Sequence, residues 1–448
     1  MSSRVAQLST GLDSLRWQVM EMLLALRGTA VALRSAMAFT KSWCTVLALL
    51  VVGCGASADP YVGGDLGPDD DAGAIIDDDA GTIIDDDAGT IIDDDAGWQD
   101  PEDPPTDPTD PTDPTDPGDP TDPTEPANPP TFVNGFPGPY ASPTIVRVGK
   151  TYHAYFAGHT IKGKHYNAPY GTFTADGNWK FKGEALPKLG KSAVDGPGKY
   201  PVWAPSVVRI NANRWMIYYT SQLQGTVGKK CIWRAHADNP AGPFVDDYAG
   251  PMYCAPNTLW AIDAYTVQDA QGGWHLSARI DQPGGINTIQ IRALTDNGAQ
   301  FASGSKWIEL THNAPKSWEQ PVLENAGIVR LTPPSGKPHW FVFYSARAWS
   351  NDSYAIGYSD CGTGINGPCT KQTPNGPWFK SNKAKGVFGP GTPTFYTDEN
   401  GDVLMSVQAW EFSGGTSNPK NHGQIMRTYK ITVDDQYKPH RMLVRVDK

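Results

Sequence analysis

The sequence has no lysine or arginine between residues 59 and 125, a stretch that holds 24 of its 48 aspartates and glutamates. Residues 132–448 have the opposite balance, with 32 lysines and arginines against 22 acidic residues, a net charge of +10. The overall charge of −11 therefore describes the acidic stretch. A basic domain suits a neutral or anionic ligand better than a cationic one. Because there is no dense Lys/Arg tract and no known binding motif, we expect no nucleic-acid partner.

The sequence has no apolar run long enough for a membrane-spanning helix in its first sixty residues. The run WCTVLALLVVG at 43–53 follows Lys41 and precedes Cys54, the order of cationic start, short apolar core and cleavage site in a secretory signal. Val51-Val52-Gly53-Cys54 resembles a bacterial lipobox, whose cysteine becomes the lipidated N-terminus. We therefore expect cleavage before Cys54, a lipid anchor to the membrane there, and a location on the bacterial cell envelope or outside the cell. Met37 is then a candidate start, and a buried hydrophobic helix is the alternative.

The segment 55–131 lacks the apolar content of a packed core. From Asp69 the unit DDDAGAII repeats with small changes, and TDP units follow from Thr106 to Pro123. The aspartates of the DDDAGAII units repel one another, and the prolines of the TDP units favour extended polyproline geometry. Both kinds of repeat therefore indicate a disordered linker. Calcium binding by the DDD clusters is the alternative, but they lack the spaced oxygen ligands and closing Glu of a calcium loop. We thus expect a signal segment at 1–54, a linker at 55–131 and a folded domain at 132–448.

Cysteine is scarce in the folded part, which contains four of the six in the chain. In an exported domain four cysteines suggest two disulfides, and three pairings are open. We predict pairing between nearest neighbours, with four buried thiols as the alternative. The predicted pairs are Cys231 with Cys254 and Cys361 with Cys369.

Long amphipathic helical patterns are also missing from the folded part, where short strand pairs recur instead. Segments such as SPTIVRVGKTYHAYFA begin near residues 142, 204, 261, 325 and 391, at spacings of 62, 57, 64 and 66 residues. Four strands with their connections fill about this length, so a repeat of this period predicts an all-β, five-bladed propeller. A two-sheet sandwich is the alternative, but it does not predict a regular long period.

The propeller geometry predicts where a functional site would lie, because the innermost strands of all blades start at the same end of the axis. The residues at the heads of the five copies should therefore converge on one pocket. Two of these heads, on neighbouring blades, are carboxylates. The five heads are Ser142, Trp203-Ala204, Asp263, Glu324 and Gly391-Thr392.

Several motifs, in order and at blade spacing, resemble glycoside hydrolase family 43, whose members are five-bladed propellers that cleave arabinosides, xylosides and galactosides. The resemblance covers about residues 135–448 and implies an inverting glycosidase with a carbohydrate substrate. We expect a monomer that needs no cofactor or metal. The motifs are Trp203-Ala204-Pro205, Ile262-Asp263-Ala264 with Asp269, Glu324 followed by Tyr344-Ser345, and the turns Gly242-Pro243-Phe244 and Gly376-Pro377-Trp378.

The resemblance also implies roles for the two carboxylates. An inverting glycosidase needs a protonated acid beside the leaving oxygen and a base that activates water. By position Glu324 is the acid, and Asp263 is the modulator that raises its pKa through like-charge repulsion. Glu319, two residues before Pro321, is a rival for the acid, and we prefer Glu324 because it is closer to the blade-four strand. Aromatic rings stack on the apolar faces of sugars, and the candidate sugar-binding residues are Trp203, Trp260, Tyr344 and Trp410.

The sequence departs from the family where the catalytic base is expected. The residue directly before the proline of blade one is an aspartate in the family and Ser142 here, and a serine hydroxyl has no useful basicity near neutral pH. Thr392 and Gln408 replace two histidines that are common in the family. Some members, notably exo-β-1,3-galactanases, also lack the usual base and a glutamine is implicated in its place, so Gln408 and Ser142 are candidates for the base or for positioning water. The alternative function is a propeller that binds carbohydrate without cleaving it.

Overall fold

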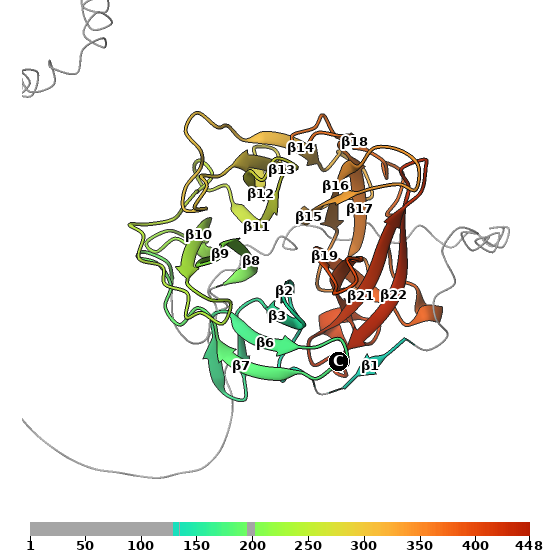
Figure 1. The fold of residues 1–448 in the computed structure, drawn as a ribbon, viewed down its shortest axis with the longest axis horizontal. Coiled ribbons are helices and arrows are strands. Elements are labelled where there is room, and N and C mark those ends of the chain that lie inside the picture. The colour runs from blue at the N-terminus through green and yellow to red at the C-terminus, as the bar shows by residue number, and fades with distance from the viewer. Residues whose placement is uncertain (1–128, 134, 195–201) are drawn as a thin grey trace, which may run out of the picture. The chain divides into compact units, whose positions relative to one another are not determined.

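The computed structural model describes residues 129–133, 135–194 and 202–448. The predicted signal segment with Cys54, and the predicted linker as far as residue 128, lie outside the described residues. Five sheets surround a common axis (Figure 1). This arrangement confirms the predicted all-β, five-bladed propeller and excludes the sandwich.

The first two blades lie between residues 144 and 237. In blade 1 the order from the axis outward is β2-β3-β6-β7, and the hairpin β4-β5 projects from it. Blade 2 has the order β8-β9-β10. The bounds are β2 (Thr144–Val148), β3 (Thr151–Tyr155), β4 (His159–Ile161), β5 (Lys164–Tyr166), β6 (Pro169–Phe173), β7 (Lys180–Glu184), β8 (Trp203–Asn211), β9 (Arg214–Gln222) and β10 (Lys230–Ala237).

The other three blades follow in chain order around the axis. Blades 3 and 4 are four-stranded, and in blade 5 the short strand β1 (Thr131–Phe132) adds to the outer edge, parallel to β22. Among the described residues, no helix has the length and apolar character needed to cross a membrane. The bounds are β11 (Ala261–Gln268), β12 (Trp274–Gln282), β13 (Ile286–Ala293) and β14 (Ile308–His312) in blade 3; β15 (Leu323–Leu331), β16 (His339–Ala346), β17 (Ala355–Asp360) and β18 (Thr370–Lys371) in blade 4; and β19 (Phe388–Thr397), β20 (Val403–Trp410), β21 (Gln424–Val433) and β22 (Pro439–Asp447) in blade 5.

The core is divided among the blades. In the described part of the chain, each interface between neighbouring blades has its own buried apolar cluster. Strands such as β9 (RWMIYYTSQ) and β16 (HWFVFYSA) are buried along almost their whole length, because both of their faces pack against another blade. Such strands read as continuous apolar runs rather than alternating ones.

The two disulfides of the described domain are those predicted from nearest-neighbour pairing. Cys231 on β10 is bonded to Cys254, in the segment that leads to blade 3. Cys361 is bonded to Cys369 and closes the loop between β17 and β18. Both bonds tie outer parts of a blade and lie away from the inner strands.

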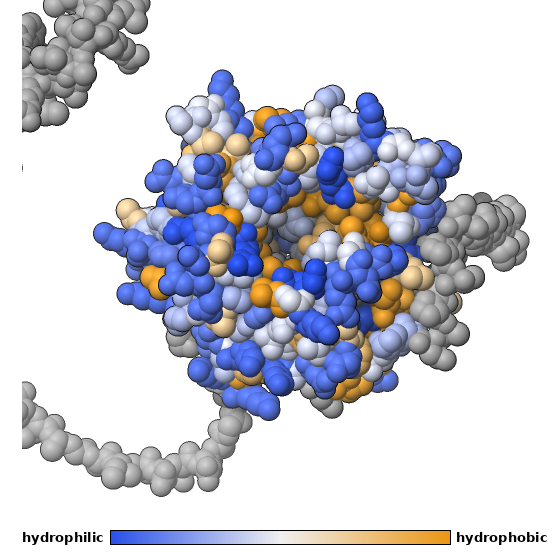
Figure 2. Space-filling model, in the orientation of Figure 1, coloured by the Kyte–Doolittle hydropathy of each residue, from blue (hydrophilic) through white to orange (hydrophobic). Residues whose placement is uncertain are grey.

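The heads of the inner strands share an unusual backbone conformation. One residue at the head of each blade has a positive φ, which residues other than glycine rarely adopt. In blades 2 to 5 the pairing of the first two strands shifts register at this residue, as in a β-bulge that re-aims a side chain. Figure 2 shows a hollow at the centre of the ring of blades. The residues are Ser142 (φ 46°), Ala204 (40°), Asp263 (58°), Asn325 (47°) and Thr392 (51°).

Candidate active site

A small cavity lies where the five inner strands begin. Its volume is about 20 Å³, enough for one water molecule. Ser142, Ala204, Asp263, Asn325 and Thr392 all contribute to its lining. The predicted convergence of the blade heads is therefore present, with one correction of detail: in blade 4 the lining residue is Asn325, and the predicted Glu324 comes directly before it.

Asp263 and Glu324 are both buried, with 6% and 8% of their surfaces exposed. Oδ2 of Asp263 accepts a hydrogen bond of 3.1 Å from the backbone N–H of Asn325, which brings the head of blade 3 against that of blade 4. Burial, together with the negative charge of Glu324, raises the pKa of Asp263 to about 8. Burial and the neighbouring charge therefore favour the protonated form of Asp263 over its carboxylate.

Glu324 is held by two donors that the sequence analysis did not identify. Nη1 of Arg279 lies 2.9 Å from Oε2 of Glu324, and the hydroxyl of Tyr354 donates to Oε1 at 2.9 Å. Nε of Arg279 also lies 2.8 Å from Oδ1 of Asp281. Burial disfavours the charge of Arg279, but the carboxylates of Asp281 and Glu324 outweigh it and raise the pKa of Arg279. Glu324 is thus bound as a carboxylate.

Arg279 belongs to a set of contacts that repeats around the axis. Arg279 pairs with Ile262, directly before the head residue Asp263, and its side chain contacts Glu324 on the next blade. In other blades, the residue at the equivalent position also contacts the head of the next blade. In three blades the side chain at this position accepts a hydrogen bond from the backbone N–H of the next head. These contacts are Asp263 to Thr220 Oγ1 (3.0 Å), Thr392 to Ser345 Oγ (2.8 Å) and Ser142 to Gln408 Oε1 (2.8 Å).

This repeat supplies a signal that sequence reasoning missed. Arg279 follows its head residue Asp263 by sixteen positions, as Thr220 follows Ala204 and Gln408 follows Thr392. An arginine in place of these uncharged side chains indicates an acidic partner on the next blade. No comparable signal identifies Asp281 or Tyr354, which contact the site through a strand end and a loop.

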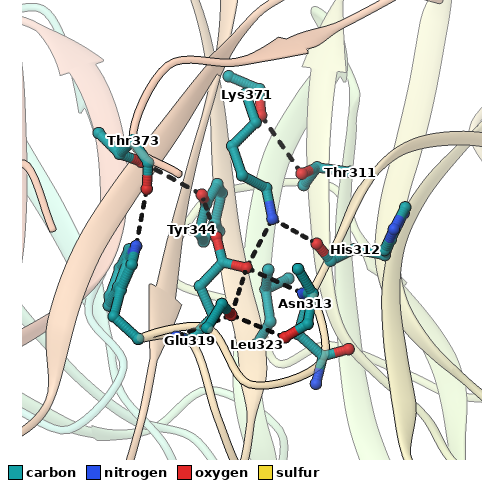
Figure 3. A network of polar contacts seen from close by, with 12 residues as sticks. Thr311, His312, Asn313, Glu319, Leu323, Tyr344, Lys371 and Thr373 are labelled. Atoms are coloured by element: carbon teal, nitrogen blue, oxygen red, sulfur yellow. Dashed lines mark hydrogen bonds and ion pairs between the residues drawn. The ribbon is translucent and has the colours of Figure 1, made fainter. Parts of the chain in front are cut away.

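Glu319, the rival acid, lies in a separate network, which Figure 3 shows. It is fully buried. Its Oε2 lies 2.6 Å from Nζ of Lys371, and its Oε1 accepts a hydrogen bond of 2.6 Å from the hydroxyl of Tyr344. These contacts attach the segment before β15 to β16 and β18 of blade 4. The carboxylate of Glu319 is therefore committed to packing rather than to the axial cavity.

The four aromatic candidates divide into two pairs. Trp203 and Trp260 are half-buried, and their ring centroids lie 5.8 Å apart with an edge-to-face angle of 65°. The guanidinium of Arg279 lies 5.9 Å from the ring of Trp260, so this pair borders the Glu324 site. Tyr344 and Trp410 have 0% and 4% of their surfaces exposed. This burial argues against the expectation that Tyr344 and Trp410 bind sugar, because so little of either side chain is accessible to a ligand.

Ser142 and Gln408 lie together on the blade-one side of the cavity. Oε1 of Gln408 is occupied by the N–H of Ser142, and its amide nitrogen donates no hydrogen bond within the described residues. Of the residues that line the cavity, only Asp263 carries a carboxylate. In the described ranges, no cluster of three or more His, Cys, Asp and Glu side chains is arranged to hold a metal ion.

Comparisons with known proteins agree with this geometry. The family model described as glycosyl hydrolases family 43 matches residues 134–432, whereas no curated protein matches the chain. Similar solved structures include a thermostable family-43 glycoside hydrolase (18% identity, 67% of this chain and 92% of that one, TM-score 0.54). An endo-1,4-β-xylanase from Bacteroides thetaiotaomicron (20%, 69% and 97%, 0.54) and an α-L-arabinanase from Cellvibrio cellulosa (17%, 67% and 94%, 0.51) are also similar. At these identities the structural likeness shows the shared fold.

Proposed function

Because the chain belongs to glycosyl hydrolases family 43, we propose that it hydrolyses O-glycosidic bonds of an oligosaccharide or polysaccharide by acid-assisted inversion. The substrate is of the arabinoside, xyloside or galactoside type, a range that includes the arabinan and xylan named for two of the similar structures. The observation that carries the proposal is the buried pair of carboxyl groups on neighbouring blades: Asp263, which lines the axial cavity, and Glu324, directly before the lining residue Asn325.

Glu324 is the acid in this proposal, and the expected role of Asp263 changes: it supplies the proton of Glu324 rather than repelling its charge. In the resting site Asp263 holds the proton, while Arg279 and Tyr354 bind Glu324 as a carboxylate. Two neighbouring carboxyl groups titrate as a pair, and one proton is shared between them. When a sugar occupies the site, the proton moves to Glu324 and from there to the leaving glycosidic oxygen.

The water that attacks the anomeric carbon is positioned from the blade-one side. Ser142 lines the cavity there, and the amide N–H of Gln408, whose Oε1 accepts from the N–H of Ser142, is the proposed donor for a water or a sugar hydroxyl. Neither group is basic near pH 7, so the proton that the attacking water loses passes to solvent water rather than to a strong general base. We therefore expect slower turnover than a site with a carboxylate at this position would give.

A second function, carbohydrate binding without cleavage, is favoured by one observation, the serine at the place of the base. The two functions are separated by incubating the full-length protein with aryl arabinosides, xylosides and galactosides and with arabinan, xylan and galactan. Turnover with a product of inverted anomeric configuration, followed by ¹H NMR, supports the hydrolase. Binding of a polysaccharide without turnover supports the binding protein, and a product of retained configuration contradicts the inverting mechanism.

We also propose that Cys54 carries a lipid and that segment 55–131 spaces the propeller from the bacterial envelope. The support is the lipobox-like sequence before Cys54 and the acidic, proline-rich composition that follows it. Mass spectrometry of the exported protein tests this proposal, with Cys54→Ser as the control. An exported chain whose N-terminus is not an acylated Cys54 overturns it.

A further inference from the structure

Two large aromatic side chains are exposed at the end of the propeller where the inner strands begin. Trp349 is 51% exposed and Phe412 is 39% exposed. Trp349 follows β16, whose last residue, Ala346, pairs with the first residue of β15. Phe412 follows β20, whose last residue, Trp410, pairs with the first residue of β19. Both rings therefore lie on loops at the same end as Glu324.

The two loops are bonded to each other. Nε1 of Trp410 donates to the carbonyl of Trp349 at 3.2 Å, and the N–H of Thr416 donates to the carbonyl of Ser350 at 2.8 Å. The carboxylate of Asp352 accepts a further hydrogen bond of 2.9 Å from the N–H of Gly414. The loops of blades 4 and 5 thus form one unit.

Two glycines permit the close approach of these loops. A Cβ atom on Gly415 would lie 1.9 Å from the carbonyl oxygen of Ser350, and one on Gly389 would lie 2.5 Å from that of Asn351. Both glycines also have a positive φ, 54° and 56°. The backbone next to Trp349 is therefore held by close contacts with Gly415 and Gly389. Because this loop is ordered before a ligand binds, less conformational entropy is lost on binding.

The same loop connects to the proposed acid. It ends at Tyr354, which is fully buried and donates to Glu324. The axial cavity, at about 20 Å³, holds one water molecule rather than a sugar ring. A glycan at this site must therefore be bound largely by residues around the mouth of the cavity.

We propose that Trp349 and Phe412 form a binding platform for sugar rings of a glycan chain, outside the axial cavity and linked to Glu324 through the loop that ends at Tyr354. The inference rests on the proposed function in that the ligand is a carbohydrate. It deepens that function, because a platform outside the cavity selects a polymer of several sugar units over a small glycoside. The apolar faces of successive sugar rings would stack on the exposed aromatic rings.

The experiment measures binding of the full-length protein to arabinan, xylan and galactan by affinity electrophoresis. Dissociation constants for the matching hexasaccharide and monosaccharide follow from titration calorimetry, and all variants carry Glu324→Gln so that no ligand is consumed. Trp349→Ala or Phe412→Ala should weaken binding of the hexasaccharide about tenfold and leave that of the monosaccharide unchanged, whereas Trp349→Phe should retain most of the affinity. Val245→Ala is the matched control, because Val245 is 50% exposed on the outside of blade 2.

Equal hexasaccharide affinity in Trp349→Ala, Phe412→Ala and the control overturns the proposal, as does a failure of every polysaccharide to bind the parent protein. The thermal unfolding midpoint of each variant shows whether a loss of affinity reflects unfolding. The experiment can reject the proposed platform and the proposed hydrolysis independently of each other. Polysaccharide that binds through Trp349 without being cleaved by the unmutated protein rejects only the hydrolase, and cleavage that is insensitive to both aromatic substitutions rejects only the platform.

Discussion

Nη1 of Arg279 lies 2.9 Å from Oε2 of Glu324, and both side chains are buried. A buried arginine so close to the proposed acid favours its ionised form, and burial together with the negative charge of Glu324 raises the pKa of Asp263. The site therefore keeps its proton on Asp263 until a ligand rearranges these contacts. Arg279 is a positioning residue in this account, since it acts through Glu324.

Substitution of Arg279 tests this arrangement through pH dependence. Arg279→Gln removes the cation, which raises the pKa of the carboxyl pair, so the alkaline limb of the kcat/KM profile should move upward by about one pH unit or more. Arg279→Lys keeps the charge and should leave the limb near its original place. A lower rate at every pH with an unmoved limb would show that Arg279 only supports the fold.

The raised pKa of Asp263 predicts a pH-dependent stability. Between the pKa of an unfolded aspartate, about 4, and the folded value of about 8, the folded protein holds a proton that the unfolded chain has lost. The contribution of Asp263 to stability is thus fully present below pH 4 and is lost as the pH rises to 8. Asp263→Asn should remove this loss and raise the free energy of unfolding at pH 8, relative to pH 5, by roughly 2–4 kcal/mol. Urea unfolding at the two pH values measures the difference, and parallel curves for both proteins would contradict the assignment.

Restoring a carboxylate on blade one should increase turnover. Ser142 lines the cavity and has a φ of 46°, a conformation that aspartate tolerates better than most residues. In Ser142→Asp a general base would face the attacking water, and kcat should rise by roughly 10²-fold or more. Ser142→Asn is the control of equal shape without basicity. Equal rates in the two variants would place the attacking water elsewhere.

Gln408 has two proposed roles, joining blade 5 to blade 1 and donating to the attacking water. Thr220 and Ser345, which occupy the equivalent positions in blades 2 and 4, can only join neighbouring blades. Like Thr220 and Ser345, it accepts a head N–H from the next blade, so alanine at any of the three positions should cost about 1 kcal/mol of stability. Only Gln408→Ala should also lower kcat, because its amide N–H is the proposed donor to the attacking water or to a sugar hydroxyl. Equal loss of stability with unchanged kcat in all three variants would limit Gln408 to joining blades 5 and 1.

The repeat in the sequence was sufficient to place Asp263 and Glu324 together, because a propeller brings every blade head to one axis. Arg279 could be located only by comparing the residues sixteen positions after each blade head. Tyr354 could not be located, since its contact depends on which way a loop turns. Tyr344 illustrates the same difficulty, because all residues of β16 beyond the first are buried and the sequence does not show which ones face the mouth. The calcium alternative for the acidic repeat and the lipid anchor at Cys54 remain predictions.

The most direct test of the central claim, that Glu324 of blade 4 acts with Asp263 of blade 3 in one acid site, is the initial rate of glycoside hydrolysis by Glu324→Gln. Glu309→Gln is the matched control, because Glu309 is an exposed carboxylate paired with His312 on the outer strand of blade 3. The account predicts at least a hundredfold loss of kcat/KM for Glu324→Gln and an unchanged rate for the control. A Glu324→Gln rate equal to that of the unmutated protein would contradict it.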